Sequence, residues 1–160
     1  GQSPAGIEFC DKFANQRFMF GHPKVINYLE ENKNNKKKFG SYLYAHIITA
    51  KTDSEAKTIG QNIIDKADKE AIETMITSSM LDTNKGGGSE AMQAALNQPL
   101  EDGNMAFTSA PVIYGSPKTV AEKLDNIIER TNTDGFMFSW NDYVSGIKVF
   151  GEEIRPHLKN

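Results

Sequence analysis

Cysteine is nearly missing from this sequence, because Cys10 is the only one among 160 residues. One thiol cannot form an intramolecular disulfide, which excludes the small secreted folds that disulfides hold together. No apolar run reaches the length of a membrane span, and the first residues lack the charged, apolar and small-residue regions of a secretory signal. These absences indicate a protein of the reducing cytoplasm that does not enter a membrane.

Histidine and net positive charge are also scarce. The three histidines, His22, His46 and His157, are scattered and have no Glu or Cys at ligand spacing, so we expect no metal site. The formal net charge of −3 argues against non-specific binding of nucleic acid. A local run of lysines at positions 33 and 36–38 is interpreted as the solvated end of a helix.

What is present suits one globular domain. Hydrophobic residues make up 38% of the chain and charged residues 24%, which is typical of a folded protein. A length of 160 residues is enough for one hydrophobic core and short for two. We therefore expect residues 1–160 to form a single domain.

Predicted helices and strands alternate along the chain. Apolar spacing predicts strands at 16–20, 42–48, 112–114 and 136–140, and helices at 4–15, 24–38, 53–79 (in one or two segments), 117 up to the Asp134-Gly135 turn, and 142–158. The strand at 42–48 is nearly all apolar, so we expect it at the centre of a sheet that is covered on both faces. The alternation indicates parallel βαβ units and an α/β fold.

Residues 80–111 interrupt this alternation. The segment contains Gly86-Gly87-Gly88, Pro99 and Asp102-Gly103, with only a weak helical pattern at 89–96. Connections of this length in compact domains tend to be either lids or disordered segments. The segment is therefore predicted to be an insertion, and both interpretations stay open.

The first helix begins without a strand before it, which predicts an upstream portion of the fold outside these residues. Ser3 is a typical N-cap and Pro4 suits the first helical position. The free N–H groups of such a helix start can bind a phosphate group, but from these residues alone an ordinary cap is the better interpretation. Cys10 falls among Phe9 and Phe13 and is expected to be a buried structural thiol.

Several longer motifs resemble one family. They are GQSPAG at 1–6, YGSPKTVA at 114–121, DGF at 134–136, and NDYVSGI at 141–147 leading to FGEEIRP at 150–156. Together they resemble the luciferase-like flavin monooxygenases, and most of all the pyrimidine monooxygenases of uracil degradation within that family. The resemblance extends over nearly the whole chain but only over the C-terminal part of the family's barrel.

The resemblance implies a fold and an activity. The fold would be the C-terminal portion of a TIM (β/α)8 barrel with a long insertion. The activity would be that of an oxygenase in which reduced FMN, supplied by a separate NAD(P)H-dependent reductase, reacts with O2, and the ring of a uracil-like substrate is opened. Ser3 matches the family's flavin-phosphate serine, which makes phosphate binding there the preferred interpretation. No catalytic residue can be assigned, because the early strands of the family have no counterpart in this chain.

Two other functions stay open. The chain could be a truncated, non-catalytic barrel that serves as a scaffold or interaction domain, or it could belong to a related monooxygenase of sulfones, sulfonates or chelates. Too few strands are present to close a barrel, and an open sheet edge exposes backbone groups. We therefore expect the edge to be covered by the other part of a barrel or by a second copy of the chain.

Five further residues are considered for the site. His22 lies in a loop that could face the mouth of a barrel, although loop polarity explains it equally well. His46 is interpreted as a satisfied core imidazole, and His157 is placed favourably near a helix C-terminus. Trp140 and Tyr143 follow the last strand, where barrel active sites lie, and could form the wall of a site for a planar ligand or pack in the core.

Overall fold

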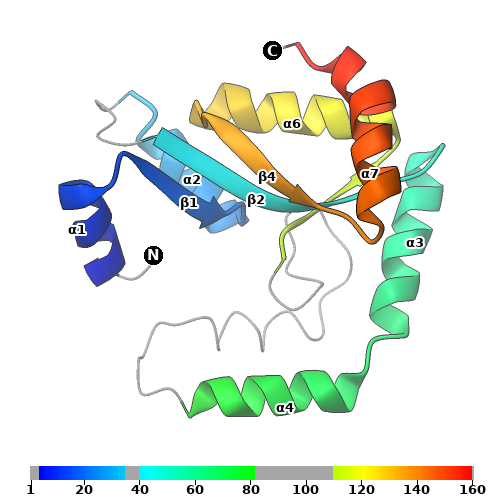
Figure 1. The fold of residues 1–160 in the computed structure, drawn as a ribbon, viewed down its shortest axis with the longest axis horizontal. Coiled ribbons are helices and arrows are strands. Elements are labelled where there is room, and N and C mark those ends of the chain that lie inside the picture. Colours follow the sequence, from blue (N-terminus) through cyan, green and yellow to red (C-terminus); the bar gives the residue numbers. More distant parts are fainter. Residues whose placement is uncertain (1–3, 35–39, 82–109, 160) are drawn as a thin grey trace.

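The computed structural model describes residues 4–34, 40–81 and 110–159. Within them, four parallel strands form one sheet (Figure 1): β1 (Gln16–Phe20), β2 (Gly40–Thr49), β3 (Val112–Gly115) and β4 (Gly135–Ser139). β2 is the longest of these strands and pairs with each of the other three. The prediction of a central strand at this position is therefore confirmed.

β1 and β3 lie along one edge of β2, and β4 lies along the other. On the first edge, Tyr44 accepts a hydrogen bond from Gly21 N at 3.0 Å, and His46 donates one to Pro111 O at 2.8 Å. Ser41 points its carbonyl to the opposite edge and accepts from Asp134 N at 2.8 Å. β4 thus pairs with β2, and among the described strands it does not pair with β3, which precedes it in the chain.

Helices and helical turns connect the strands and follow the last one. They are α1 (Pro4–Phe13), α2 (Pro23–Glu31), α3 (Asp53–Asp65), α4 (Lys69–Met80), α6 (Pro117–Thr131), α7 (Tyr143–Val149), a π-helical turn η1 (Phe150–Ile154) and a 3-10 turn η2 (Arg155–His157). The α/β alternation predicted from the sequence is present.

Local sequence explains where several helices begin. Thr52 accepts a hydrogen bond from Glu55 N while the Glu55 carboxylate accepts from Thr52 N, which forms a capping box at α3. Ser116 caps α6 and is followed by Pro117, whose missing N–H is not needed in the first turn. Asp142 caps α7 by accepting from Ser145 N at 2.8 Å.

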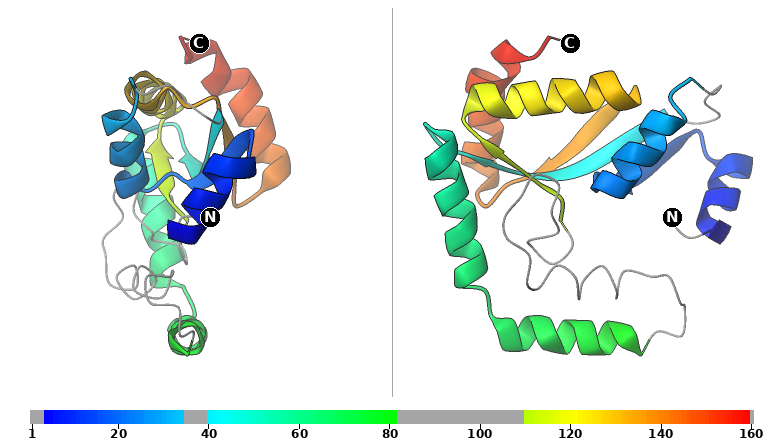
Figure 2. Two further views of the ribbon diagram at one scale, coloured as in Figure 1. Left: turned by 90° about the vertical axis from the view of Figure 1, so that its left-hand side faces the viewer. Right: turned by 180° about the vertical axis from the view of Figure 1, so that it is seen from behind.

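One face of the sheet carries the main core. α2 and α6 lie together on this face (Figure 2), where Met19, Leu43 and Ile47 are each at most 2% exposed. Alternate residues of the strands point to the opposite face. That face, which we call the open face, carries Phe18, Phe20, Tyr42, Tyr44 and Met137, whose strand positions pair in register. α3 packs against its far end through Ile48 and Ala56.

Some helix boundaries differ from the prediction. α2 ends at Glu31, and residues 35–38 of the expected helix lie outside the described residues. The pattern at 53–79 forms two helices, because Asp68 begins a new one by accepting a hydrogen bond from Ala71 N. The closing helix changes to π and 3-10 turns after Val149, and Pro156, which has no N–H to donate, lies in the 3-10 turn.

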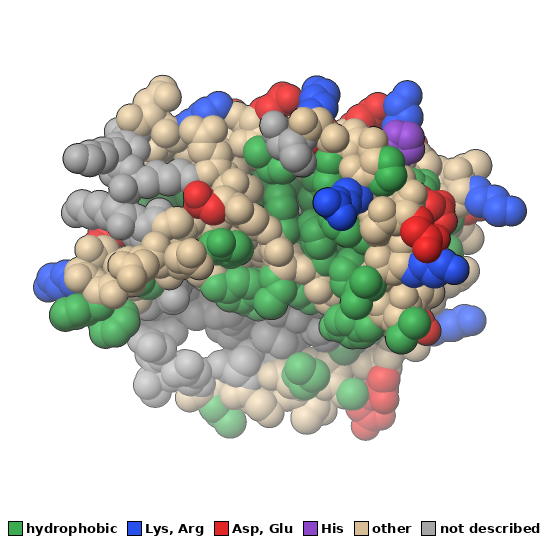
Figure 3. Space-filling model, turned by 45° about the horizontal axis from the view of Figure 1, so that its top comes forward, with side chains coloured by type: hydrophobic (Ala, Val, Ile, Leu, Met, Phe, Trp, Pro, Cys, Tyr) green, Lys and Arg blue, Asp and Glu red, His purple; other side chains and the backbone are tan. Residues whose placement is uncertain are grey.

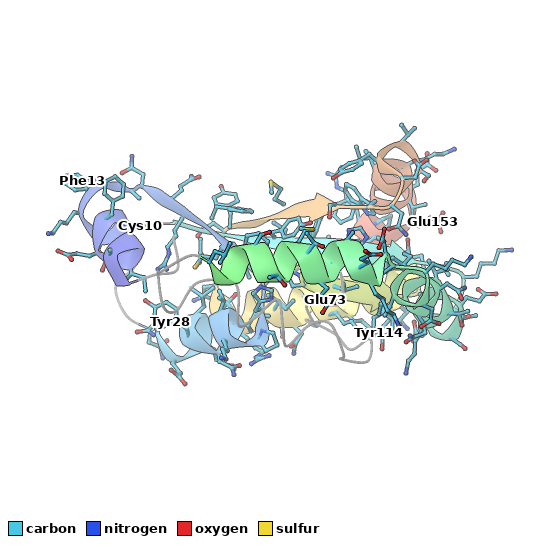
Figure 4. The ribbon with its side chains drawn as sticks, turned by 90° about the horizontal axis from the view of Figure 1, so that it is seen from below. Cys10, Phe13, Tyr28, Glu73, Tyr114 and Glu153 are labelled. Atoms are coloured by element: carbon cyan, nitrogen blue, oxygen red, sulfur yellow. The ribbon has the colours of Figure 1, made fainter. Side chains whose placement is uncertain are left out.

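The prediction that Cys10 is a buried thiol is wrong. Cys10 is half-buried, and its neighbours Phe9 and Phe13 are 62% and 72% exposed. The reason is the position of α1 beside β1, away from the helices that cover the sheet, as the labels of Cys10 and Phe13 in Figure 4 make visible.

α4 also lies apart from the sheet (Figure 1). Of its described side chains only Ile72 is half-buried, and the others are exposed. The predicted insertion at 80–111 falls mainly on residues 82–109, which lie outside the described residues. Within the described ranges, every helix is too short or too polar to cross a membrane.

Candidate functional site

The carboxyl ends of the parallel strands meet at one edge of the sheet, which is where α/β proteins place their ligand sites. β2 and β4 bring polar side chains to this edge. His46 pairs in register with Ser139, so the two side chains lie side by side on the open face. Tyr44 lies two residues earlier on β2, and Asn141 follows β4. We call these four residues the polar network.

Ser139 is the centre of the polar network. Its hydroxyl oxygen lies 2.8 Å from the Tyr44 hydroxyl and 2.8 Å from Nδ1 of His46. The Ser139 residue is only 7% exposed, so its hydroxyl depends on these two partners in place of water. The buried hydroxyl therefore fixes the relative positions of two side chains from one strand.

His46 joins this buried hydroxyl to the surface. Its Nε2 lies 3.0 Å from Oδ1 of Asn141, which is exposed. Burial lowers the pKa of His46, and the hydrogen bond with Asn141 only partly offsets that effect. The imidazole is therefore neutral at neutral pH and can accept a hydrogen bond at one nitrogen while it donates at the other.

Aromatic side chains lie beside the polar network. Phe20 stacks on His22 with ring centroids 5.9 Å apart and an angle of 11°, and Tyr44 meets Phe20 edge-on at 5.2 Å. Phe18 and Phe20 are 44% and 36% exposed. Phe18, Phe20 and Tyr44 thus form an accessible apolar surface, which we call the aromatic surface. Hydrophobic side chains also gather in the middle of the face shown in Figure 3.

Trp140 and Tyr143 come together after β4, with ring centroids 6.1 Å apart at 83°. The Trp140 ring also lies near Phe138 and Phe150, and a Cβ on Gly146 would stand only 2.2 Å from it. Its Nε1 is buried and has no hydrogen-bond partner among the described residues. Trp140 therefore packs on the main core, and the suggestion that it forms a ligand wall stays a prediction.

The start of α6 already holds a carboxylate of this chain. Asp53 Oδ1 accepts a hydrogen bond from Ser116 N at 2.7 Å, and its Oδ2 accepts one from the Thr119 hydroxyl at 3.1 Å. These bonds, the first above all, hold the pKa of Asp53 below its ordinary value. Gly115 makes the approach possible, because its φ of 152° and its contacts leave no room for a side chain. Asp53 therefore occupies the position that an external anion would need.

The other candidate residues do not belong to the polar network. Ser3 lies outside the described residues, so its role in binding a phosphate stays a prediction. His22 directly precedes α2 and stacks on Phe20, whereas His157 lies in η2, far along the chain from the polar network. No group of three potential metal ligands occurs in the described part of the chain. Of the basic run, only Lys33 is described.

A groove of about 420 Å³ lies on the helix side of the sheet, between α2 and α6. Apolar side chains including Ile26, Ile113 and Ile127 line it, and two cations border it. Arg130 forms an ion pair with Glu30, and Lys123 donates to Tyr114 O at 2.7 Å. Because both cations are engaged, this groove is a weaker candidate than the polar network.

Sequence reasoning missed Tyr44, Ser139 and Asn141. A signal was available, since Tyr42, Tyr44 and His46 alternate with Leu43 and Ala45 along β2. Period-two polarity places these side chains on one face of the strand. The pairing with Ser139 could not be predicted, because it depends on the register between β2 and β4.

Comparisons with known proteins agree with this fold. No family model matches the sequence. The chain is 28% identical over 169 residues to "Pyrimidine monooxygenase RutA" of Variovorax paradoxus, and 32% identical over 167 residues to the protein of that name from Acinetobacter baylyi. These alignments cover 100% and 98% of this chain but only 44% and 43% of the relatives. The chain thus spans less than half the length of these curated relatives.

Solved structures give the same result. A riboflavin lyase crystallised with modified FMN and riboflavin superposes with a TM-score of 0.71 at 19% identity, over 98% of this chain and 41% of that one. A long-chain alkane monooxygenase gives a TM-score of 0.68 at 18% identity, with coverage of 98% and 39%. The predicted partial (β/α)8 barrel is confirmed, and so is the resemblance to the C-terminal part of luciferase-like flavin monooxygenases.

Proposed function

Since the chain resembles the C-terminal part of luciferase-like flavin monooxygenases, we propose that it belongs to an FMN-dependent, O2-using monooxygenase that opens the ring of a uracil-like substrate. The observation that carries this proposal is the similarity of the whole chain to pyrimidine monooxygenases. The proposal places the protein in the cytoplasm, and it requires the remaining strands of the barrel.

The described residues of the open face suit a flat ring, which in this proposal is the ring of the substrate bound beside FMN. The aromatic surface offers accessible ring faces, and the polar network beside it offers hydrogen-bonding groups. Ser3 and the start of α1 would hold the phosphate group. When bound in its reduced form, the flavin supplies the electrons that activate O2.

The side chains of this chain would bind and orient the reactants. Phe18 and Phe20 would exclude water from one side of a bound ring, which strengthens polar contacts beside it. The polar network would fix the orientation of that ring through Tyr44 and Asn141. No described residue is assigned a covalent role.

Two partners follow from the proposal. A separate NAD(P)H-dependent flavin reductase would supply the reduced FMN. The open face would be covered by the remaining part of a barrel or by a second copy of this chain, because its aromatic side chains and sheet edges are accessible.

The test is a titration of the chain with FMN, followed by flavin fluorescence. We expect saturable binding in the micromolar range that Ser3→Ala weakens and that Ser78→Ala, on the exposed surface of α4, leaves unchanged. A folded chain that does not bind FMN would favour the alternative function, a non-catalytic scaffold. Binding that is insensitive to Ser3→Ala would contradict the assigned phosphate site.

A further inference from the structure

The polar network has one consistent direction of hydrogen bonding. Oδ1 of Asn141 can only accept, so Nε2 of His46 carries the proton in their 3.0 Å contact. A neutral imidazole has one N–H, which leaves Nδ1 as an acceptor for the Ser139 hydroxyl. Ser139 has only one proton to donate, so its oxygen accepts the proton of Tyr44 in the remaining contact.

This direction fixes what the two ends of the network offer to a ligand. The Tyr44 hydroxyl donates its one hydrogen bond to Ser139, so its oxygen presents lone pairs and can act only as an acceptor toward a ligand. The Nδ2 group of Asn141 has no hydrogen-bond partner among the described residues, and it presents N–H donors at an exposed position. The site thus offers one acceptor and one donor next to the aromatic surface.

We propose that Tyr44 and Asn141 are specificity-determining residues that bind a flat heterocycle carrying both N–H and C=O groups, that is, a cyclic amide or imide. The ring N–H donates to the Tyr44 oxygen, and the ring carbonyl accepts from Asn141 Nδ2. This inference rests on the proposed function, and it names the part of the chain that recognises the substrate. His46 and Ser139 are positioning residues, because they set the direction of both end groups.

The aromatic surface explains the preference for a flat ring. Tyr44 itself belongs to this surface, and its ring meets Phe20 edge-on at 5.2 Å. A flat ligand that reaches the Tyr44 hydroxyl therefore covers exposed apolar carbon at the same time, which is favourable. Rings that lack the N–H leave an acceptor of the site unpaired, and such mismatches reduce affinity.

The first experiment measures the tautomer of His46 in the ligand-free chain. Two-dimensional 15N NMR at neutral pH is expected to show a protonated Nε2 and an unprotonated Nδ1. Ser139→Ala should move the Nδ1 resonance, because it removes the hydrogen bond to that nitrogen. A proton on Nδ1 in the unsubstituted chain would reverse the direction of the network and overturn the proposal.

The second experiment titrates the chain with uracil and with 1,3-dimethyluracil, which has no N–H. We expect uracil to bind about tenfold more tightly than the dimethyl compound, and Tyr44→Phe and Asn141→Asp each to weaken uracil binding about tenfold. Asn141→Asp keeps an acceptor for His46, replaces the donor with a carboxylate oxygen and adds a negative charge. Tyr28→Phe is the matched control, since Tyr28 lies exposed on α2 (Figure 4).

Two outcomes overturn the inference. One is uracil binding that neither substitution at the site weakens, and the other is a folded chain that does not bind uracil. An FMN titration of the same samples separates this result from the proposed function. FMN binding that depends on Ser3, together with uracil binding that ignores Tyr44 and Asn141, rejects only the inference. If the chain does not bind FMN but binds uracil in a way that depends on Tyr44 and Asn141, only the cofactor assignment is rejected.

Discussion

Gly146 leaves less room for a side chain than Gly115 and Gly135 do. A Cβ at this position would lie 2.2 Å from Cγ of Trp140, which is far inside van der Waals contact. The ring cannot easily retreat, because Phe138 and Phe150 pack around it. The packing of α7 against the indole of Trp140 therefore requires a residue without a side chain at position 146.

Gly146→Ala is predicted to lower the free energy of unfolding by about 1–3 kcal/mol, the usual cost of an overpacked core. Gly151→Ala is the matched control, since a Cβ there meets nothing within 4 Å, and it should be neutral or stabilising by up to about 1 kcal/mol. Urea unfolding followed by fluorescence of Trp140, the only tryptophan, measures both. Equal stabilities for the two variants would contradict the contact.

Asp53 is predicted to link stability to pH. Its folded-state pKa lies below the ordinary value, chiefly because it accepts from Ser116 N. The stabilisation is therefore fully present above the unfolded-state pKa of about 4 and is lost as the pH falls through the folded-state pKa. Asp53→Ala should lower the urea midpoint at pH 7, and the difference from the unsubstituted chain should shrink below about pH 4.

The control for this prediction is Asp11→Ala, which replaces an exposed carboxylate on α1. It should leave the midpoint unchanged at both pH values. If the difference in urea midpoint between Asp53→Ala and the unsubstituted chain stays constant down to low pH, the stability of the α6 start does not depend on the charge of Asp53.

Single residues also mark the limit of what the sequence could predict. The ends of α6 could be predicted, because Ser116 and Pro117 act through their immediate neighbours. The role of His46 could not, because it depends on Ser139, which is 93 residues away. A histidine among apolar residues predicts a core position, and only strand register shows that this one belongs to a polar network.

At the scale of elements, the apolar periodicity was sufficient for the main strands and helices. β1 has the predicted bounds, and β2, β3 and β4 lie within two residues of theirs. The prediction was weaker where packing decides the outcome. α1 has an apolar pattern but exposes Phe9 and Phe13. The reason is that α1 lies beside β1, away from the helices that cover the sheet.

α4 is predicted to be the least protected helix. It lies apart from the sheet, and a helix of 12 residues without tertiary support is marginal in water. Amide hydrogen exchange should therefore be faster by orders of magnitude in α4 than in α6, where Val120, Ala121 and Leu124 are at most 1% exposed. Comparable protection of the two helices would mean that α4 packs against another surface in solution.

At the scale of the molecule, the open face leaves apolar side chains and sheet edges exposed. Phe18 and Met137 lie on it and are 44% and 51% exposed. The outer edges of its sheet carry backbone groups that another strand could pair with. Together these features predict that the chain associates, either with itself or with the rest of a barrel.

Sedimentation equilibrium tests self-association. Phe18→Lys combined with Met137→Lys should weaken it at least about tenfold, because it places two charges on an apolar interface. Met75→Lys is the matched control, with a side chain 50% exposed on α4 instead of the open face. A monomeric mass for the unsubstituted chain at working concentration would contradict self-association.

The pairing of all strands with β2 has a consequence for the order of folding. β1 lies shortly before β2 in sequence, and their ladder closes a short loop, whereas the contact between His46 and Ser139 closes one of 93 residues. Long loops close more slowly and at a greater entropic cost. The polar network should therefore assemble late, after β1 and β2 have already joined and together with the core contacts that Ile113, Leu124 and Ile154 make, so that an early intermediate still lacks the groups that recognise a ligand.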